Sequence, residues 1–336
     1  MSNAKAVIFG VAGAELAAAE RDFFRDADPL GFILFARNCR DPHQVRRLVA
    51  ALRASVRRAD APVLIDQEGG RVARLRPPHW RDYPSAASIA ALPDPQAGAA
   101  ARLGARLIAD DLATLGITVD CMPVLDLPVP GADAIIGDRA YGSAPARVGA
   151  LGRAVCEGLL AGGVLPILKH IPGHGRAGVD SHLALPRVAA SRAELEATDF
   201  APFRALAHMP WAMTAHILYA ALDDKNPATL SQRLIADVIR ASIGFDGVLV
   251  SDDLSMAALP GRLGGRAAGA IAAGCDVALH CNGAFAEMME IAAAVGPLSP
   301  AALARIERGE ARRRIVEPFD RVEGERRFAA LMAGEG

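Results

Sequence analysis

Short apolar runs alternate along the whole chain with segments of helical period. There are eight such runs, rich in β-branched residues, at positions 6–9, 31–35, 62–65, 118–125, 164–168, 211–218, 247–250 and 276–280. Most are followed by an amphipathic stripe, such as those from Val45 to Val56 and from Leu103 to Leu115. A short, nearly continuous apolar run is typical of a strand in a parallel sheet that helices cover on its faces.

Local signals for helix ends support this alternation. Asp41-Pro42 and Asp94-Pro95 each place a capping oxygen before a proline at the first helical position, and Gly116 supplies a left-handed stop. Eight strand–helix units predict the α/β class and a (β/α)8 TIM barrel. No linker-like composition divides the chain, so we expect one domain over residues 1–336. An open, doubly wound sheet is the alternative.

Composition and charge narrow the class of partner. The chain has 336 residues, of which 52% are hydrophobic, and its net charge of −1 gives no basic field for nucleic acid or an anionic membrane. No run approaches the roughly 20 apolar residues of a membrane span, and the first five residues lack the pattern of a signal peptide. The five cysteines are scattered, without zinc or disulfide spacing. We expect a cytoplasmic protein that acts on a small molecule and has no obligate protein partner.

Polar residues of catalytic type are concentrated between Lys169 and His182. These fourteen residues hold three of the eight histidines and one of the three lysines, together with three glycines and a proline. The segment follows the apolar run 164–168, so we expect it to be a loop at the C-terminal end of a strand. That concentration predicts a functional site.

Other predicted strands also end in polar residues. In a (β/α)8 barrel the loops after the strands converge on one face, where catalytic residues lie. The residues at these ends are Asp66, Arg74, Asp126, Arg139, Lys169, His170, His174, Asp180, His182, His216, Asp252 and Asp253.

Two chemistries could use such a set. Histidines and carboxylates could bind a catalytic metal, but Pro172 and Gly173 disfavour the helix that would place His170 and His174 on one face. The alternative needs no metal or cofactor, and we predict none: one carboxylate acts as nucleophile and a separate group as acid/base. Asp180 and His182 suit the second part, because a carboxylate two residues away can accept an imidazole N–H and fix its tautomer.

The sequence resembles the bacterial β-N-acetylhexosaminidases of glycoside hydrolase family 3, over most of its length. Five specific motifs appear in the family's order. They are Asp66-Gln-Glu-Gly-Gly-Arg-Val72 with Arg74, Ile136-Gly-Asp-Arg139, Lys169-His170 with Pro172-Gly-His-Gly175, Asp180-Ser-His182, and Ser251-Asp-Asp-Leu-Ser-Met256.

The resemblance implies a barrel enzyme that removes terminal β-linked N-acetylglucosamine with retention of configuration. It implies that Asp252 is the nucleophile, His182 the acid/base on a mobile loop, and Asp180 its orienting partner. It assigns sugar binding to a further set: Asp66, Arg74, Arg139, Lys169 and His170. Because the larger β-glucosidases of the family add a sandwich domain, it favours the single-domain cytoplasmic type. The implied substrate of that type is an anhydro-muropeptide from cell-wall recycling.

Several points remain open at the level of sequence. Asp253 competes with Asp252, and because adjacent strand residues point to opposite faces we expect only one of them to aim into the barrel mouth. Rival activities are transfer to phosphate, hydrolysis of plain β-glucosides, and amino-sugar binding without turnover. Ile171 and Ala257-Ala258 depart from the usual family residues, which are phenylalanine and Glu-Gly.

Residues outside the catalytic set have structural interpretations. We expect His216 to be structural, His174 to hold its loop through hydrogen bonds, and Glu68 to brace an arginine. The arginines between Arg305 and Arg314 are expected to lie on a solvated helix face.

Overall fold

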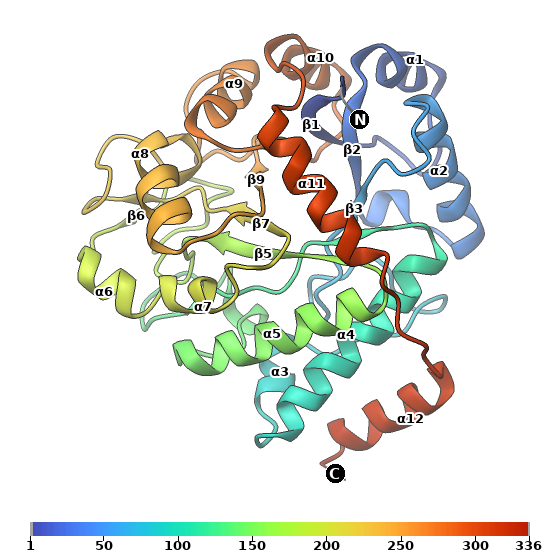
Figure 1. The fold of residues 1–336 in the computed structure, drawn as a ribbon, viewed down its shortest axis with the longest axis vertical. Helices are drawn as coiled ribbons and strands as arrows, with labels where there is room; N and C mark the ends of the chain where they lie inside the picture. Colours follow the sequence, from blue (N-terminus) through green and yellow to red (C-terminus); the bar gives the residue numbers. More distant parts are fainter. Residues whose placement is uncertain (1–2, 335–336) are drawn as a thin grey trace.

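The computed structural model describes residues 3–334, and within them eight parallel strands close into a barrel. The strands follow the order β1-β2-β3-β4-β5-β7-β9-β10, and β10 pairs back onto β1 through the register Ile8↔Leu279. Helices surround the barrel on its outside (Figure 1). The predicted (β/α)8 fold is confirmed, and the open sheet is excluded. The first two residues of the N-terminal segment considered above lie outside the described residues.

The elements have the following bounds. The barrel strands are β1 Lys5–Gly10, β2 Pro29–Leu34, β3 Val63–Ile65, β4 Val119–Asp120, β5 Leu165–Ile171, β7 Trp211–Thr214, β9 Val248–Asp253 and β10 Val277–His280. The helices are α1 Ala18–Ala27, α2 Pro42–Ser55, α3 Ala86–Ala90, α4 Gln96–Thr114, α5 Pro145–Ala161, α6 Arg192–Ala197, α7 Phe200–Ala205, α8 Gln232–Leu234, α9 Leu263–Ala273, α10 Phe285–Ala294, α11 Pro300–Arg313 and α12 Arg321–Met332.

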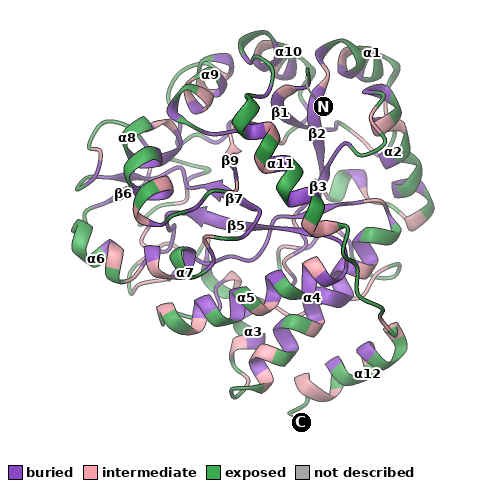
Figure 2. Cartoon of the chain, in the orientation of Figure 1, coloured by how far each residue is buried: buried purple, intermediate pink, exposed green. Residues whose placement is uncertain are grey.

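The barrel strands are buried because helices cover their outer faces. Every residue of β2 and β5 is buried, and in Figure 2 the buried colour follows the strands while the outer helix faces are exposed. Two predicted strands are too long. β4 stops at Asp120, shortly before Pro123, which has no N–H for a ladder bond. Leu218 belongs instead to a separate two-stranded sheet, β6 Arg187–Val188 with β8 Leu218–Tyr219.

Two of the three predicted helix-end signals are confirmed. The Asp41 side chain accepts a hydrogen bond from the Gln44 N–H at 2.9 Å, and Gly116 has φ of +80°. The prediction for Asp94 is wrong, because α4 starts one residue later than expected and its cap position, Pro95, has no side chain that can accept. The Asp94 carboxylate instead lies 3.4 Å from Arg147.

Helix α11 crosses the N-terminal end of the barrel (Figure 1). Arg305 on this helix bonds Asp276 at 2.9 Å and Asp246 at 3.2 Å, so the predicted solvated face is wrong for this residue. Gly309 lies against Trp211 at the start of β7. This end of the barrel is therefore covered, and the open end is the opposite one. No helix among residues 3–334 has the length and apolar character needed to cross a membrane.

Candidate active site

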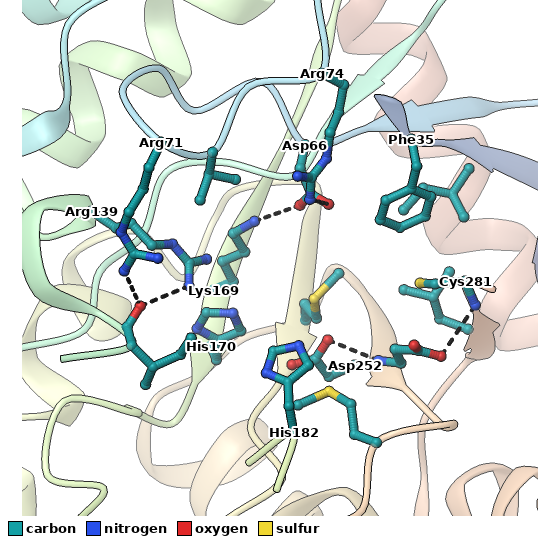
Figure 3. A pocket seen from close by; sticks show the side chains of 17 residues that line it. Phe35, Asp66, Arg71, Arg74, Arg139, Lys169, His170, His182, Asp252 and Cys281 are labelled. Carbon is teal, nitrogen blue, oxygen red and sulfur yellow. Dashed lines mark hydrogen bonds and ion pairs between the residues drawn. The ribbon is translucent and has the colours of Figure 1, made fainter. Parts of the chain in front are cut away.

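A pocket opens at the C-terminal end of the barrel (Figure 3). Side chains from the ends of most barrel strands and the loops after them surround it. They are Ile33, Phe35, Asp66, Arg71, Val72, Arg74, Ile135, Arg139, Lys169, His170, His182, Met213, Asp252, Asp253, Met256, Leu279 and Cys281. Seven of the eight predicted site residues are in this set, and the eighth, Asp180, contacts His182 from outside it.

One wall of the pocket is a row of alternating cations and carboxylates. Lys169 is 2% exposed, and its Nζ lies 2.8 Å from Asp66 and 2.6 Å from Glu68. The row continues outward at both ends. Asp66 accepts a bond from Arg74 at 3.0 Å, and Glu68 accepts two from Arg139 at 2.9 and 2.8 Å. The expected role of Glu68 as a brace for an arginine is confirmed, and it braces Lys169 as well.

This pairing fixes the charge state of the row. Burial alone would raise the pKa of the Asp66 carboxyl, but Lys169 and Arg74 outweigh it and hold that pKa well below its usual value. Burial would likewise lower the pKa of Lys169, and the two carboxylates raise it instead. The wall therefore presents ionised acceptors and donors with fixed positions, which suits the hydroxyl groups of a sugar.

His170 is oriented by the buried Asp126. The Asp126 Oδ2 atom lies 2.7 Å from His170 Nδ1, and Oδ1 accepts the backbone N–H groups of His170 at 3.1 Å and His174 at 2.6 Å. Burial would raise the pKa of Asp126, but the His170 ring lowers it below the usual value. The carboxylate can only accept, so Nδ1 carries the proton and Nε2 is left for the pocket.

Asp252 and Asp253 both border the pocket. Strand β9 ends at these two residues, and their hydrogen bonds distinguish them. Asp253 accepts from the N–H groups of Ser255 and Cys281, both at 3.1 Å, and from the Ser255 hydroxyl at 2.6 Å. Asp252 accepts only the Asp253 N–H, at 2.8 Å, among the bonds of the described chain.

The free carboxylate of Asp252 is ionised. Burial would raise the pKa of Asp252, but the His170 ring outweighs it, with further contributions from His216, the Asp253 N–H and Lys169, and the pKa lies below the usual value. Asp252 therefore has one oxygen on the backbone and the other available in the pocket.

His216 supports the end of β9 from behind. Its Nε2 lies 3.0 Å from the Asp253 carbonyl, which can only accept, and its Nδ1 lies 2.7 Å from the Thr229 hydroxyl. Burial lowers the pKa of His216, in keeping with a neutral ring. The expected structural role of His216 is confirmed.

Asp180 and His182 form a pair at the pocket edge. One oxygen of Asp180 accepts both the His182 backbone N–H at 2.8 Å and its Nδ1 at 2.7 Å. The imidazole side chain is 60% exposed, whereas that of Asp180 is 23% exposed. With Nδ1–H held by the carboxylate, Nε2 is the atom that can exchange protons with a bound molecule.

Ser181, the residue between Asp180 and His182, holds the loop that carries this pair. It was not identified from the sequence. Ser181 is buried, its hydroxyl lies 3.1 Å from His174 Nε2, and its carbonyl accepts the Ala258 N–H at 3.1 Å. The expected role of His174 in holding the loop is confirmed. A serine between two motif residues carries no signal of burial in the sequence.

Two glycines of this loop are required by close contacts. A Cβ on Gly175 would lie 2.0 Å from the Leu127 carbonyl oxygen, and one on Gly173, whose φ is +140°, would lie 2.9 Å from Asp199. Gly178 has open space around it. Of the three glycines, only Gly178 is free of a packing constraint.

Arg71 joins two of the loops that form the pocket. Its side chain bonds Asp138 at 2.9 Å and donates to the Ala134 and Ile135 carbonyls. Figure 3 shows Arg71 and Arg139 approaching the same oxygen beside the pocket. Arg71 was visible in the sequence only as part of a motif, and Phe35 only as the end of an apolar run.

No group of three or more His, Cys, Asp or Glu side chains within residues 3–334 is arranged to hold a metal ion. The ring Nδ1 atoms of His170 and His182 are each bonded to a carboxylate. The donor set in the pocket is therefore arranged as paired acids and bases.

Comparison with known proteins agrees with this arrangement. Residues 8–317 match the glycosyl hydrolase family 3 N terminal domain. The chain is 41% identical to a β-hexosaminidase of Alkalilimnicola ehrlichii over 82% of this chain and 80% of the relative. It is 38% identical to a β-hexosaminidase of Chromobacterium violaceum over 97% and 92% of the two chains.

A solved structure extends the likeness to the whole fold. NagZ from Neisseria gonorrhoeae, in complex with N-trifluoroacetyl-D-glucosamine, is similar with a TM-score of 0.86 and 31% identity, over 100% of this chain and 99% of that one. With its eight-stranded barrel, its row of paired charges and its free aspartate at the end of β9, the chain belongs to glycoside hydrolase family 3, as a relative of the β-hexosaminidases.

Proposed function

We propose that the protein is a retaining β-N-acetylhexosaminidase that hydrolyses terminal β-linked N-acetylglucosamine through a covalent intermediate on Asp252. The observation that carries the proposal is the difference between the two adjacent carboxylates. Asp253 is saturated by three donors, whereas Asp252 keeps an ionised oxygen in a pocket that also contains His182.

In the first step, the free oxygen of Asp252 attacks the anomeric carbon while the bond to the glycosidic oxygen breaks. The His182 imidazolium gives its Nε2 proton to the departing oxygen, which leaves as an alcohol. Asp180 stabilises the imidazolium before the transfer and keeps Nδ1 protonated after it. The products are a glycosyl ester on Asp252 and a neutral His182.

In the second step, neutral His182 accepts a proton from water, and the water oxygen bonds to the anomeric carbon. The ester bond breaks, and the Asp252 carboxylate and the His182 imidazolium are regenerated. Two displacements at the same carbon give net retention.

The row of charges would hold the sugar for this attack. We assign Asp66, Arg74, Arg139, Lys169 and His170 to substrate binding. Asp66 offers carboxylate oxygens to vicinal hydroxyls, and His170 offers Nε2 because Asp126 occupies its other nitrogen. No metal or cofactor has a role in this mechanism.

The experiment that tests the proposal traps the intermediate. A 5-fluoro-N-acetylglucosaminyl fluoride is incubated with the protein in the presence of a chelator, and the labelled peptide is sequenced by mass spectrometry. Label on Asp252 supports the proposal. Label on Asp253 would identify Asp253 as the nucleophile instead. If the wild-type protein is neither labelled nor able to release 4-nitrophenol from its N-acetyl-β-glucosaminide, the protein binds amino sugars without turnover.

The matching kinetic test uses Asp252→Ala. Loss of a nucleophile lowers kcat by several orders of magnitude, whereas an Asp22→Asn control on the surface leaves it unchanged. The same assay with the 2-hydroxy glucoside, and with added phosphate, separates a β-glucosidase or a phosphorylase from the proposed hydrolase. A chelator-sensitive wild type would favour a metal hydrolase.

For the natural substrate we propose GlcNAc-1,6-anhydro-MurNAc peptides in cell-wall recycling, in the cytoplasm. The resemblance of the five motifs to those of the bacterial β-N-acetylhexosaminidases of the family supports this substrate. Release of N-acetylglucosamine from purified anhydro-muropeptides, compared with chitobiose, tests the preference. Faster cleavage of chitobiose would contradict it.

A further inference from the structure

A third acid lies beneath the row of charges and has no role in the mechanism above. Asp120 ends β4, is 0% exposed, and stands in register with Ile65 of the neighbouring β3. The chain leaves β3 at that point and enters the segment that holds Asp66, Gln67 and Glu68. Asp120 is therefore placed against the backbone that presents two carboxylates of the proposed sugar site.

The two oxygens of Asp120 have different surroundings. Oδ1 accepts the Gln67 backbone N–H at 2.9 Å, which fixes the residue between the two carboxylates of the row. The Gln67 side chain in turn accepts the N–H groups of Arg74 at 2.8 Å and Leu75 at 2.9 Å. A series of hydrogen bonds therefore connects Asp120, through Gln67, to the backbone of Arg74. Oδ2 is buried and has no hydrogen-bond partner among the described residues.

A carboxylate with a single donor is poorly accommodated in such a place. A buried charge without pairing is costly, and an acid avoids that cost by keeping its proton. The charged or titratable groups that act on Asp120 are Lys169, Asp66, Glu68, Cys121 and Tyr141. Burial raises the pKa of Asp120 to about 8, and the lowering effect of the Gln67 N–H and Lys169 does not cancel it.

We propose that Asp120 is a positioning residue that fixes the Asp66–Glu68 segment for sugar binding, and that it does so as a neutral carboxylic acid. As an acid it supplies the carbonyl oxygen that Gln67 needs and adds no third negative charge beside Asp66 and Glu68. The role in sugar binding rests on the proposed function of Asp66.

Ionisation of Asp120 in alkaline solution would change the site. A third carboxylate would compete with Asp66 and Glu68 for Lys169 and would repel both. Asp66 and Lys169 are proposed to bind the sugar and not to react with it. We therefore expect ionisation of Asp120 to change KM more than kcat. Asp120→Asn keeps the acceptor and the shape but cannot ionise, whereas Asp120→Ala loses the acceptor.

The experiment compares wild type, Asp120→Asn and Asp120→Ala on 4-nitrophenyl N-acetyl-β-glucosaminide between pH 6 and 9.5. In the wild type, KM rises several-fold between pH 7 and 9, while kcat follows the same pH profile in wild type and Asp120→Asn. In Asp120→Asn, KM equals the wild-type value at pH 7 and stays level above it, and in Asp120→Ala it is raised at every pH. An identical alkaline rise of KM in wild type and Asp120→Asn, or a wild-type KM in Asp120→Ala, would overturn the proposal.

A second measurement does not depend on activity. The folded pKa lies above the unfolded value of about 3.9, so between about pH 4 and 8 the folded protein keeps a proton that the unfolded chain has lost. Stability from this group is present below that window and is lost as the pH rises through it. The Tm of the wild type should therefore fall relative to that of Asp120→Asn between pH 5 and 8.

The two measurements separate the possible failures. Parallel Tm curves would show that Asp120 is ionised in the folded protein and would overturn its neutral state. A wild type that does not turn over the substrate, but shows the Tm difference, would reject the proposed function while leaving the neutral acid standing.

Discussion

One oxygen of Asp180 bonds both the backbone N–H and the ring Nδ1 of His182, at 2.8 and 2.7 Å. The two bonds hold the imidazole on its own turn of the chain, so its orientation does not depend on a distant element. Burial would raise the pKa of Asp180, but the bonds to His182 hold it below the usual value. The carboxylate therefore stays charged under the ring that is proposed to donate the proton.

Asp180→Asn should lower kcat by about 10²–10⁴-fold, because the amide oxygen can keep both bonds to His182 but has no charge to stabilise the imidazolium. The loss should be smaller for 4-nitrophenyl substrates than for poor leaving groups, since an acidic phenol needs little help from an acid. A measurement of kcat for a series of aryl N-acetyl-β-glucosaminides checks this. Equal losses across the series would contradict a role for the pair in protonating the leaving oxygen.

Ser181 gives a separate test of the loop. Ser181→Ala removes the bond to His174 while leaving the carbonyl bond to Ala258 in place. We expect kcat to fall about tenfold, the cost of about one hydrogen bond, with KM little changed. The exposed Ser143→Ala is the matched control and should behave as wild type. A wild-type kcat in Ser181→Ala would show that the bond does not position His182.

Glu68→Gln tests the row of charges. The amide cannot neutralise Lys169 and Arg139, and breaking a buried pair costs about 3–5 kcal/mol because the partner charge is left uncompensated. We expect a lower Tm and a KM raised about tenfold or more, because both cations line the sugar pocket. Thermal unfolding and steady-state kinetics measure the two effects. Glu317→Gln, an exposed pair with Arg102, should change neither, and an unaltered KM in Glu68→Gln would contradict a role in sugar binding.

The barrel and the gathering of the site follow from local patterns in the sequence. Continuous apolar runs predict strands buried on both faces, and polar residues after each run must meet at one end of a parallel barrel. That reasoning places Asp66, Lys169 and Asp252 in one pocket without any long-range information, and the structure brings them together.

What could not be predicted depends on packing between distant segments. Asp120 appears in the sequence as one polar residue in an apolar run, and only the register of β4 against β3 brings it to Gln67. Ser181 looks like a spacer until the loop folds onto His174. Asp94 has the pattern of a cap but forms an ion pair with Arg147 of the following helix α5, because the cap position of α4 is Pro95. Composition and hydrophobic periodicity do not predict these contacts.

The buried His174 gives a prediction for acid stability. Burial and the neighbouring His170 lower the pKa of His174 to about 4, while the unfolded chain binds that proton near pH 6.5. Between these values the unfolded state carries a proton that the folded state does not, so stability falls as the pH falls from 6.5 to 4 and changes no further from this group below 4. By pH 5 the contribution of His174 should lower the free energy of unfolding by about 2 kcal/mol.

His174→Gln keeps a polar group beside Ser181 but cannot take up the proton. We expect its Tm to fall less than that of the wild type between pH 7 and 5, whereas the exposed His79→Gln should follow the wild-type curve. Thermal unfolding at half-unit steps of pH measures the difference directly. If His174→Gln and wild type lose the same stability over that range, His174 is protonated in the folded protein, and the Ser181 hydroxyl must then accept from its Nε2.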